Sequence, residues 1–388
     1  MQLFQTTLKC RLITPMFMAG ADGREPELRP SEFKGMMRFW WRKAKAIKDI
    51  KELKKEETKI FGGSGEISQK SKVLLKIKSK FDPNYFIFGK EGVTIKEVYN
   101  LHFKYHKETR SLQGKDAGIG YLFYSTYLPG KERGFIKEGF EFELELCEWD
   151  KEQNEKLNKN PFLNFISALW LAVYLGGFGL RARARRGGGN LEIIEVKYKN
   201  KISKNVPLIF ECEAIDKKEL KKFLKENLEK IKEICQSSEK SSLFGTKIII
   251  FDPQKTWIEA LNFLGEEYQK FRISHKNKIF ETAAFGMQVL HEKGKLRLVP
   301  YESDKLDERY RLSTRLASPL IFKVLKGKGG YFPIIVKLPQ KDTPFIGLEE
   351  KKGKNWLPIK IKKFNEYLVE KFLENFKEKE ELVVWRHT

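Results

Sequence analysis

Residues 176–190 read Gly-Gly-Phe-Gly-Leu-Arg-Ala-Arg-Ala-Arg-Arg-Gly-Gly-Gly-Asn, which places four arginines within six positions among six glycines. Glycine allows positive φ and close approach of the backbone, so successive amides can form an anion-binding concavity. Arginine adds planar pairs of donors that match phosphate oxygens. We therefore predict a clamp for a phosphate backbone, with a flexible and solvated basic loop as the alternative. The predicted clamp consists of Arg181, Arg183, Arg185, Arg186, Gly187, Gly188 and Gly189.

The segments on either side of this loop predict a helix and a strand. Residues 162–175 are almost wholly apolar, and Asn160 followed by Pro161 is typical of a helix start. Gly176 is predicted to end that helix in a left-handed conformation. Residues 190–199 then alternate as in a strand.

The first 150 residues add the other elements of a compact unit. We predict strands over residues 3–13, 72–80 and 139–147, and a helix over residues 32–47. Residues 81–137 are rich in aromatic residues and chain breakers and are interpreted as an insertion. The order strand, helix, strand, strand, helix, strand is that of a βαββαβ, or ferredoxin-like, domain.

The predicted helix over residues 32–47 carries a cationic stripe on one face, with a tryptophan at its border. A basic track beside a stacking aromatic ring is typical of nucleic-acid binding. The alternative is a solvated helix face, but solvated faces usually mix charges and this one carries no acid between Phe33 and Ile47. The residues assigned to RNA binding here are Lys34, Arg38, Trp41, Arg42 and Lys45.

The second half repeats the alternation of strands and helices. We predict strands over residues 208–215, 247–251 and 382–385, and hairpins that pair residues 285–290 with 295–300 and 318–325 with 331–338. Helices are predicted from Asp216 to about Cys235, from Asp252 to about Arg272 and over residues 363–377. The predicted fold class is thus α+β, with two tandem ferredoxin-like (RRM-like, βαββαβ) domains at residues 1–200 and 201–388, each with insertions.

Composition points to a polyanionic partner. The 388 residues carry a formal net charge of +23, for which nucleic acid is the commonest explanation and an anionic membrane the rival. No apolar run approaches the roughly 20 residues of a spanning helix, and the first residues lack the features of a signal peptide. We therefore expect a cytoplasmic protein with no membrane partner. The four cysteines include no Cys-x-x-Cys pair, so we expect reduced thiols and no zinc.

Several segments together resemble the RAMP superfamily of CRISPR-associated proteins, and within it the Cmr-one subunits of type III-B effector complexes. The resemblance implies two fused ferredoxin-like domains in a ribonucleoprotein with guide RNA, target RNA and other Cmr subunits. It also implies a role in target RNA capture, as part of antiviral defence. We expect that role to be non-catalytic and to need no cofactor. The resembling segments are residues 14–21, 33–42, 61–62, 176–190 and 315–320.

Catalytic residues are harder to assign. Backbone-cleaving relatives use an aspartate in the loop after the first strand, and Asp22 lies in such a loop beside Gly23. That pattern is equally ordinary turn chemistry, which we favour. Histidines are absent from the first hundred residues, and we treat His102 and His106 as surface residues. We expect a non-catalytic RNA-binding subunit whose groove is closed by Arg311 and Arg315. The alternatives are a metal-dependent endoribonuclease that uses Asp22 and a scaffold whose charge only docks other subunits.

Overall fold

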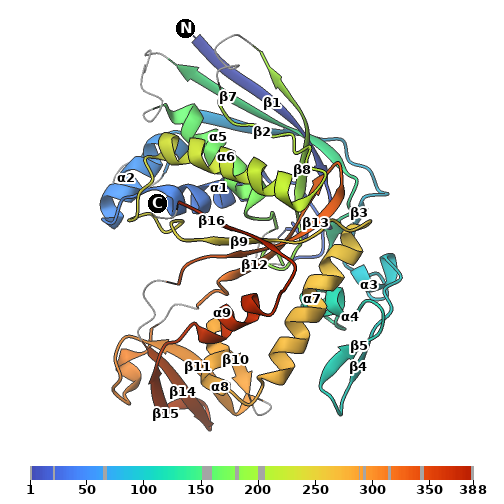
Figure 1. The fold of residues 1–388 in the computed structure, drawn as a ribbon, viewed down its shortest axis with the longest axis vertical. Helices are drawn as coiled ribbons and strands as arrows, with labels where there is room; N and C mark the ends of the chain where they lie inside the picture. Colours follow the sequence, from blue (N-terminus) through green and yellow to red (C-terminus); the bar gives the residue numbers. More distant parts are fainter. Residues whose placement is uncertain are drawn as a thin grey trace.

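The fold is α+β and contains several antiparallel sheets, as predicted (Figure 1). In this computed structural model, structure is described for residues 2–20, 22–63, 68–150, 160–179, 183–199, 206–287, 289–291, 294–312, 316–340 and 345–385.

The first sheet has the strand order β2-β7-β1-β8, and every neighbouring pair is antiparallel. Helix α1 follows its first strand in the chain, and α5 connects its third strand to its fourth, so the predicted strand–helix succession is present. A further helix, α2, lies between α1 and β2. The bounds are β1 (Gln2–Leu12), α1 (Pro30–Ala44), α2 (Ile50–Phe61), β2 (Val73–Lys78), β7 (Glu141–Asp150), α5 (Pro161–Tyr174) and β8 (Leu191–Tyr198).

A second sheet has the order β12-β13-β9-β16 and is also antiparallel throughout. Its central strands are again the first and third in the chain, with α7 after the first and α9 before the fourth. Helix α6 precedes the sheet and packs on α5 and α1. The bounds are α6 (Lys217–Cys235), β9 (Lys247–Ile250), α7 (Trp257–Ser274), β12 (Leu320–Gly327), β13 (Gly330–Lys337), α9 (Tyr367–Glu374) and β16 (Glu380–Val383).

Two hairpins inserted in the second half form a third sheet, β10-β11-β14-β15. It lies apart from the first sheet, at the opposite end of the molecule (Figure 1). A small apolar cluster that includes Met287, Leu298 and Ile346 packs against it. The bounds are α8 (Ile279–Thr282), the 3-10 turns at Ala283–Phe285 and Glu308–Tyr310, β10 (Val289–His291), β11 (Leu296–Tyr301), β14 (Phe345–Lys352) and β15 (Asn355–Lys363).

The insertion of the first half packs on a helix of the second half. Helices α4 and α7 cross so closely that a Cβ on Gly118 would lie 2.0 Å from the Asn262 carbonyl oxygen, so only glycine fits there. Gln269 of α7 also bonds both backbone groups of Leu112. The elements of the insertion are β3 (Phe86–Ile87), α3 (Ile95–Val98), β4 (Lys104–His106), β5 (Ser111–Gln113), α4 (Ala117–Leu122), a 3-10 turn at Tyr124–Thr126 and β6 (Phe135–Ile136).

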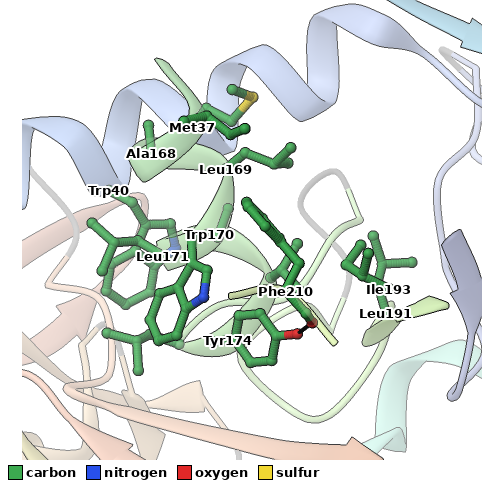
Figure 2. Packing of buried hydrophobic residues seen from close by; sticks show 14 of the residues in the cluster. Met37, Trp40, Ala168, Leu169, Trp170, Leu171, Tyr174, Leu191, Ile193 and Phe210 are labelled. Atoms are coloured by element: carbon green, nitrogen blue, oxygen red, sulfur yellow. Dashed lines mark hydrogen bonds between the residues drawn. The ribbon is translucent and has the colours of Figure 1, made fainter. Parts of the chain in front are cut away.

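Helix α5 is at the centre of the larger apolar core. Every residue from Phe162 to Tyr174 is buried, which explains its uniformly apolar sequence. Trp170 and Tyr174 stack with a 4.6 Å centroid distance (Figure 2). Their polar atoms donate to the backbone carbonyls of residues 209 and 210, respectively. Asn160 caps the helix through the amides of Phe162 and Leu163, as predicted.

The second sheet is buried on both faces. Ile248 and Ile250 of β9 belong to the core around α5, whereas Ile249 belongs to a separate core with α7 and α9. In Figure 1 the sheet accordingly lies between α5 and α6 on one side and α7 and α9 on the other. This arrangement explains why its strands are nearly continuous runs of apolar residues, as is typical of strands covered on both faces.

Some local predictions were wrong. Residues 208–215 are not a strand, since their backbone pairs with no other strand. Helix α7 is capped by Thr256, not by Asp252. Gly176 is not left-handed, because α5 ends on Leu175 in a right-handed conformation. The hairpin of β14 and β15 was missed, and the helix predicted over residues 363–377 is confined to Tyr367–Glu374.

Candidate nucleic-acid interface

The segment over residues 176–190, here called the arginine loop, connects α5 to β8. Structure is described for residues 176–179 and 183–190 of this loop, and Arg181 lies outside the described residues. Gly189 has φ +67°, and a Cβ on it would lie 1.6 Å from the Phe178 carbonyl oxygen. Glycine is therefore required there for packing of the loop on itself.

The amides of the glycine run are used within the protein. Gly188 donates to the Arg183 carbonyl at 3.0 Å, and Gly189 donates to the Pro15 carbonyl at 2.9 Å. Gly187, Gly188 and Gly189 are all buried. The predicted anion concavity of three free amides is therefore wrong, because two of those donors already have backbone acceptors.

The described arginines of the loop each contact a different part of the molecule. Arg183 donates to the hydroxyl of Ser125 in the insertion. Arg185 donates to the Ser318 carbonyl and lies over the ring of Phe39 in α1, 5.5 Å from its centroid. The third, Arg186, is described with α7 below. The loop therefore joins the insertion, α1 and the second half of the chain.

No carboxylate compensates these guanidinium groups in the part of the chain that the structure describes. Burial, together with the neighbouring charge of Arg186, lowers the pKa of Arg183 to about 10. Burial also lowers the pKa of Arg185, again with a contribution from Arg186. An anion placed beside them would favour their charged forms and relieve this mutual repulsion.

These arginines line a cavity of about 790 Å³, here called the arginine cavity. Its wall combines α1, the insertion, the arginine loop and the second half of the chain. None of the described residues that line it is acidic. Five arginines of the described part contribute to the wall, together with apolar side chains from α1 and the second half. The arginines are Arg133, Arg183, Arg185, Arg186 and Arg272.

On the α7 side of the cavity, two arginines surround a buried tyrosine. Arg186 lies 5.0 Å from the Tyr268 ring centroid, and Arg272 donates to the Tyr268 hydroxyl at 3.2 Å. Burial raises the pKa of Tyr268, but the fields of these two arginines outweigh it and the net shift is downward. One guanidinium nitrogen of Arg186 is buried without a hydrogen-bond partner, as is the indole nitrogen of Trp40, which also lines the cavity. Donors without acceptors favour a ligand rich in acceptor oxygens.

The cationic stripe of α1 has an acidic partner that its own sequence does not contain. Glu57 of α2 is only 4% exposed and forms a bidentate ion pair with Arg42. Arg38 lies 3.4 Å from the same carboxylate and also donates to the carbonyls of Phe61 and Gly62. The interpretation of Arg38 and Arg42 as a free phosphate track is therefore wrong, because these side chains hold α2 against α1.

Trp41 does not lie at the surface. It is 0% exposed, and its indole nitrogen donates to the Asn164 side chain at 3.1 Å. Lys45 is buried beside it, with its ammonium 5.5 Å from the ring centroid, and burial lowers the pKa of that lysine. The predicted stacking of Trp41 on a base and the predicted phosphate contact of Lys45 are both wrong. Lys34 is half-buried, and burial lowers its pKa.

The predicted closure of the groove by the second half finds no support at Arg311. This side chain donates to the Glu349 carboxylate at 2.6 Å and to the Trp356 carbonyl at 3.1 Å, both in the third sheet. Arg315 lies outside the described residues. The second half instead contributes Arg272, which was not predicted as a binding residue because it lies in an ordinary amphipathic helix. Arg133 was missed for a similar reason, since it lies in an irregular insertion.

Asp22 behaves as a turn residue. Its carboxylate accepts from the amides of Arg24 and Glu25, and the hydrogen bond from Arg24 lowers its pKa. His102 and His106 are exposed, as expected.

Within the described ranges we find no cluster of three or more histidine, cysteine or acidic side chains suited to hold a metal ion. Across those same ranges, every helix is too short or too polar to cross a bilayer.

The sequence and the fold are both similar to those of known CRISPR proteins. The model of the RAMP superfamily matches residues 9–192. Two proteins of Pyrococcus furiosus, named CRISPR system Cmr subunits Cmr1-2 and Cmr1-1, are 28% identical over 49% of this chain and 96% of theirs, and 27% identical over 81% of each. The crystal structure of apo Cmr1 from the same organism matches 98% of this chain and 99% of its own with a TM-score of 0.60 at 21% identity.

A chain from a cryo-EM structure of the type III-B Cmr-beta complex bound to cognate target RNA matches 96% of this chain and 98% of its own, with a TM-score of 0.56 at 16% identity. At that identity the match supports the fold alone. The chain is therefore similar to the RAMP superfamily over residues 9–192, and to Cmr1 subunits of the CRISPR Cmr system along most of its length.

Proposed function

We propose that this protein is a non-catalytic RNA-binding subunit of a type III-B CRISPR ribonucleoprotein. It grips guide RNA, or the duplex of guide and target RNA, and aids the capture of target RNA beside other Cmr subunits. Its relatives are named as Cmr1 subunits, and a structural neighbour belongs to a complex with target RNA. The architecture we propose is two tandem ferredoxin-like domains, which the two antiparallel sheets with their paired helices support.

The observation that carries this proposal is the arginine cavity. Among the described residues, five arginines and no acid line it, and Arg186 and Trp40, each of which has a buried donor without a partner, belong to its wall. Guanidinium groups match phosphate oxygens, and contacts of this kind recognise the backbone and not the base sequence. We therefore place the RNA contact at the arginine cavity and not along the α1 stripe, whose arginines are paired with Glu57.

A metal-dependent endoribonuclease that uses Asp22 is the less favoured alternative. Asp22 already accepts two backbone hydrogen bonds within its turn, and among the described residues no acidic or histidine cluster accompanies it. A scaffold role, in which the charge only docks other subunits, is the third possibility. Such docking would not explain why the arginines line a cavity.

Titration of RNA binding against salt tests the proposal. The probe is a fluorescently labelled single-stranded oligouridylate, titrated by anisotropy with the full chain at several salt concentrations. We compare the wild type with Arg183→Gln/Arg185→Gln, and use Arg309→Gln as the control because Arg309 is exposed and pairs with Asp307 outside the cavity. Each lost phosphate contact to a single strand should reduce the log–log salt slope by about 0.7.

A weaker affinity with a shallower slope in the double variant alone supports the proposal. Equal affinity and slope in all three proteins would place the RNA elsewhere. Binding to Cmr partner subunits that is weakened while RNA binding is unchanged would favour the scaffold. Cleavage of the probe in Mg²⁺ that Asp22→Ala abolishes would favour the endoribonuclease.

A further inference from the structure

Strand β12 is an edge strand of the second sheet, and the arginine loop covers that edge. The sheet order ends on β12, and the amide of Phe322 donates to the Arg185 carbonyl at 3.1 Å. Arg186 and Phe322 form an isolated parallel bridge at the same place. The loop therefore occupies the edge to which a further strand would otherwise add.

The two faces of β12 make different contacts with the arginine loop. Alternate residues of a strand point to opposite faces, and Phe322 packs with α7 and α9 whereas its neighbours Ile321 and Leu325 pack in the core around α5. On the α7 face, the guanidinium of Arg186 lies 5.2 Å from the centroid of the Phe322 ring. On the other face, Lys323 points towards the first half of the chain.

Lys323 is fully buried and binds both ends of the loop. It is 0% exposed. Its ammonium donates to the carbonyl of Gly176, the first residue of the loop, and to the side-chain oxygen of Asn190, the last residue, at 2.9 Å. Neither acceptor is a carboxylate, and burial lowers the pKa of Lys323 well below its usual range. A buried lysine without a carboxylate partner is costly to the fold and needs a compensating role.

The acceptor on Asn190 is itself held in place. The amide nitrogen of its side chain donates to the hydroxyl of Thr14 at 3.0 Å and to the carbonyl of Gly187 at 2.8 Å. A hydrogen-bond network thus runs from Lys323 through Asn190 to the loop after β1 and to the glycine run. Such a network orients its members more strongly than a single contact does.

We propose that Lys323, from the second half of the chain, is a positioning residue that holds together the two ends of the arginine loop. These ends, Gly176 and Asn190, are here called the neck of the loop. By fixing both ends of the loop, Lys323 holds Arg183, Arg185 and Arg186 at the wall of the arginine cavity before RNA arrives. The inference rests on the proposed RNA-binding function for its binding readout, but its effect on the loop itself is independent of RNA. A lysine that only fills space in the core would influence stability and leave the loop unchanged.

Hydrogen–deuterium exchange and RNA binding of full-length Lys323→Met test this role. Methionine keeps an unbranched, flexible side chain that is one atom shorter, and it removes all donors. The matched control is Lys337→Met, because Lys337 is also a buried lysine, lies on the neighbouring strand β13, and pairs with Glu366 and Glu370 away from the loop. A second variant, Lys323→Gln, keeps a donor at shorter reach and serves if the methionine variant does not fold.

In Lys323→Met, we expect faster exchange in peptides that span residues 176–190, with little change in peptides of β9 and β13. Affinity for the labelled oligouridylate should fall by about tenfold or more, because arginines held in place before binding need less ordering on binding. The log–log salt slope should be retained, since no arginine has been removed. The control should show neither change.

Exchange and affinity equal to those of the control would overturn the inference. Faster exchange with unchanged affinity would overturn it as well, because the neck would then not position the arginines for binding. If the wild type does not bind the probe, the proposed function fails, and the exchange comparison still decides whether Lys323 closes the neck.

Discussion

Replacement of Trp41 by alanine distinguishes a core tryptophan from an RNA-stacking one. The sequence pattern favours stacking, whereas the structure buries the whole side chain. We expect Trp41→Ala to lower stability strongly and to leave RNA affinity, measured on the folded protein, within about twofold of the wild type.

The expected loss of stability follows from the surroundings of Trp41. The ring packs edge-on against Phe61 at 6.0 Å and donates its indole hydrogen to Asn164 at 3.1 Å. Truncation of a buried tryptophan costs about 3–5 kcal/mol, and a hydrogen bond of this kind contributes about 1 kcal/mol to such losses. We therefore expect the free energy of unfolding to fall by about 3–5 kcal/mol.

Urea unfolding followed by circular dichroism, together with oligouridylate binding, measures both quantities. Tyr105→Ala is a suitable control, because Tyr105 is 58% exposed and its loss should change stability by no more than about 0.5 kcal/mol. An unfolding midpoint close to that of the wild type, with RNA affinity reduced more than tenfold, would refute this reasoning and return Trp41 to the RNA interface.

Further predictions concern the loop, the buried lysine and the turn aspartate. Gly189→Ala should unfold or strongly destabilise the protein, because its Cβ meets the backbone of Phe178; Gly353→Ala, also at positive φ but in open space, should cost only about 1–2 kcal/mol by thermal or urea unfolding. Lys323 has a lowered pKa in the fold, so the unfolded chain binds its proton more tightly. The free energy of unfolding should therefore rise with pH from that lowered pKa up to about 10.4, the usual pKa of lysine. Urea titrations at several pH values should show that this rise is absent in Lys323→Met. Asp22→Ala should leave RNA in Mg²⁺ as intact as the wild type does, as judged on a denaturing gel.

The regular elements could be predicted because their signals are local. The apolar run that becomes α5 and its cap at Asn160 were read correctly, and so was the pairing of β12 with β13. The hairpin of β14 and β15 was missed because its exposed strand is rich in lysine and does not alternate clearly. Residues 208–215 were misread because an apolar pattern shows burial in a core and does not show a strand partner.

The functional residues depended much more on the tertiary structure. The arginine loop was found from sequence because its composition is unusual, but its glycine amides were assigned to a ligand when two of them bond the backbone. Arg38 and Arg42 appeared uncompensated because Glu57 lies on another helix. Helical spacing alone did not reveal that the helix face with Trp41 packs against the core.

The sequence by itself determined the α+β class, the net charge of +23, the resemblance to the RAMP superfamily and the position of the arginine loop. These depend on composition and on patterns within about twenty neighbouring residues. Only the tertiary structure decided which cations remain without an acid and which side chains meet at one cavity. Arg133, Arg272 and Lys323 are distant from the loop in the chain. Tertiary packing brings them to it, from the insertion for Arg133 and from the second half for Arg272 and Lys323. Charge compensation and burial are properties of contacts between distant segments, so local sequence does not specify them.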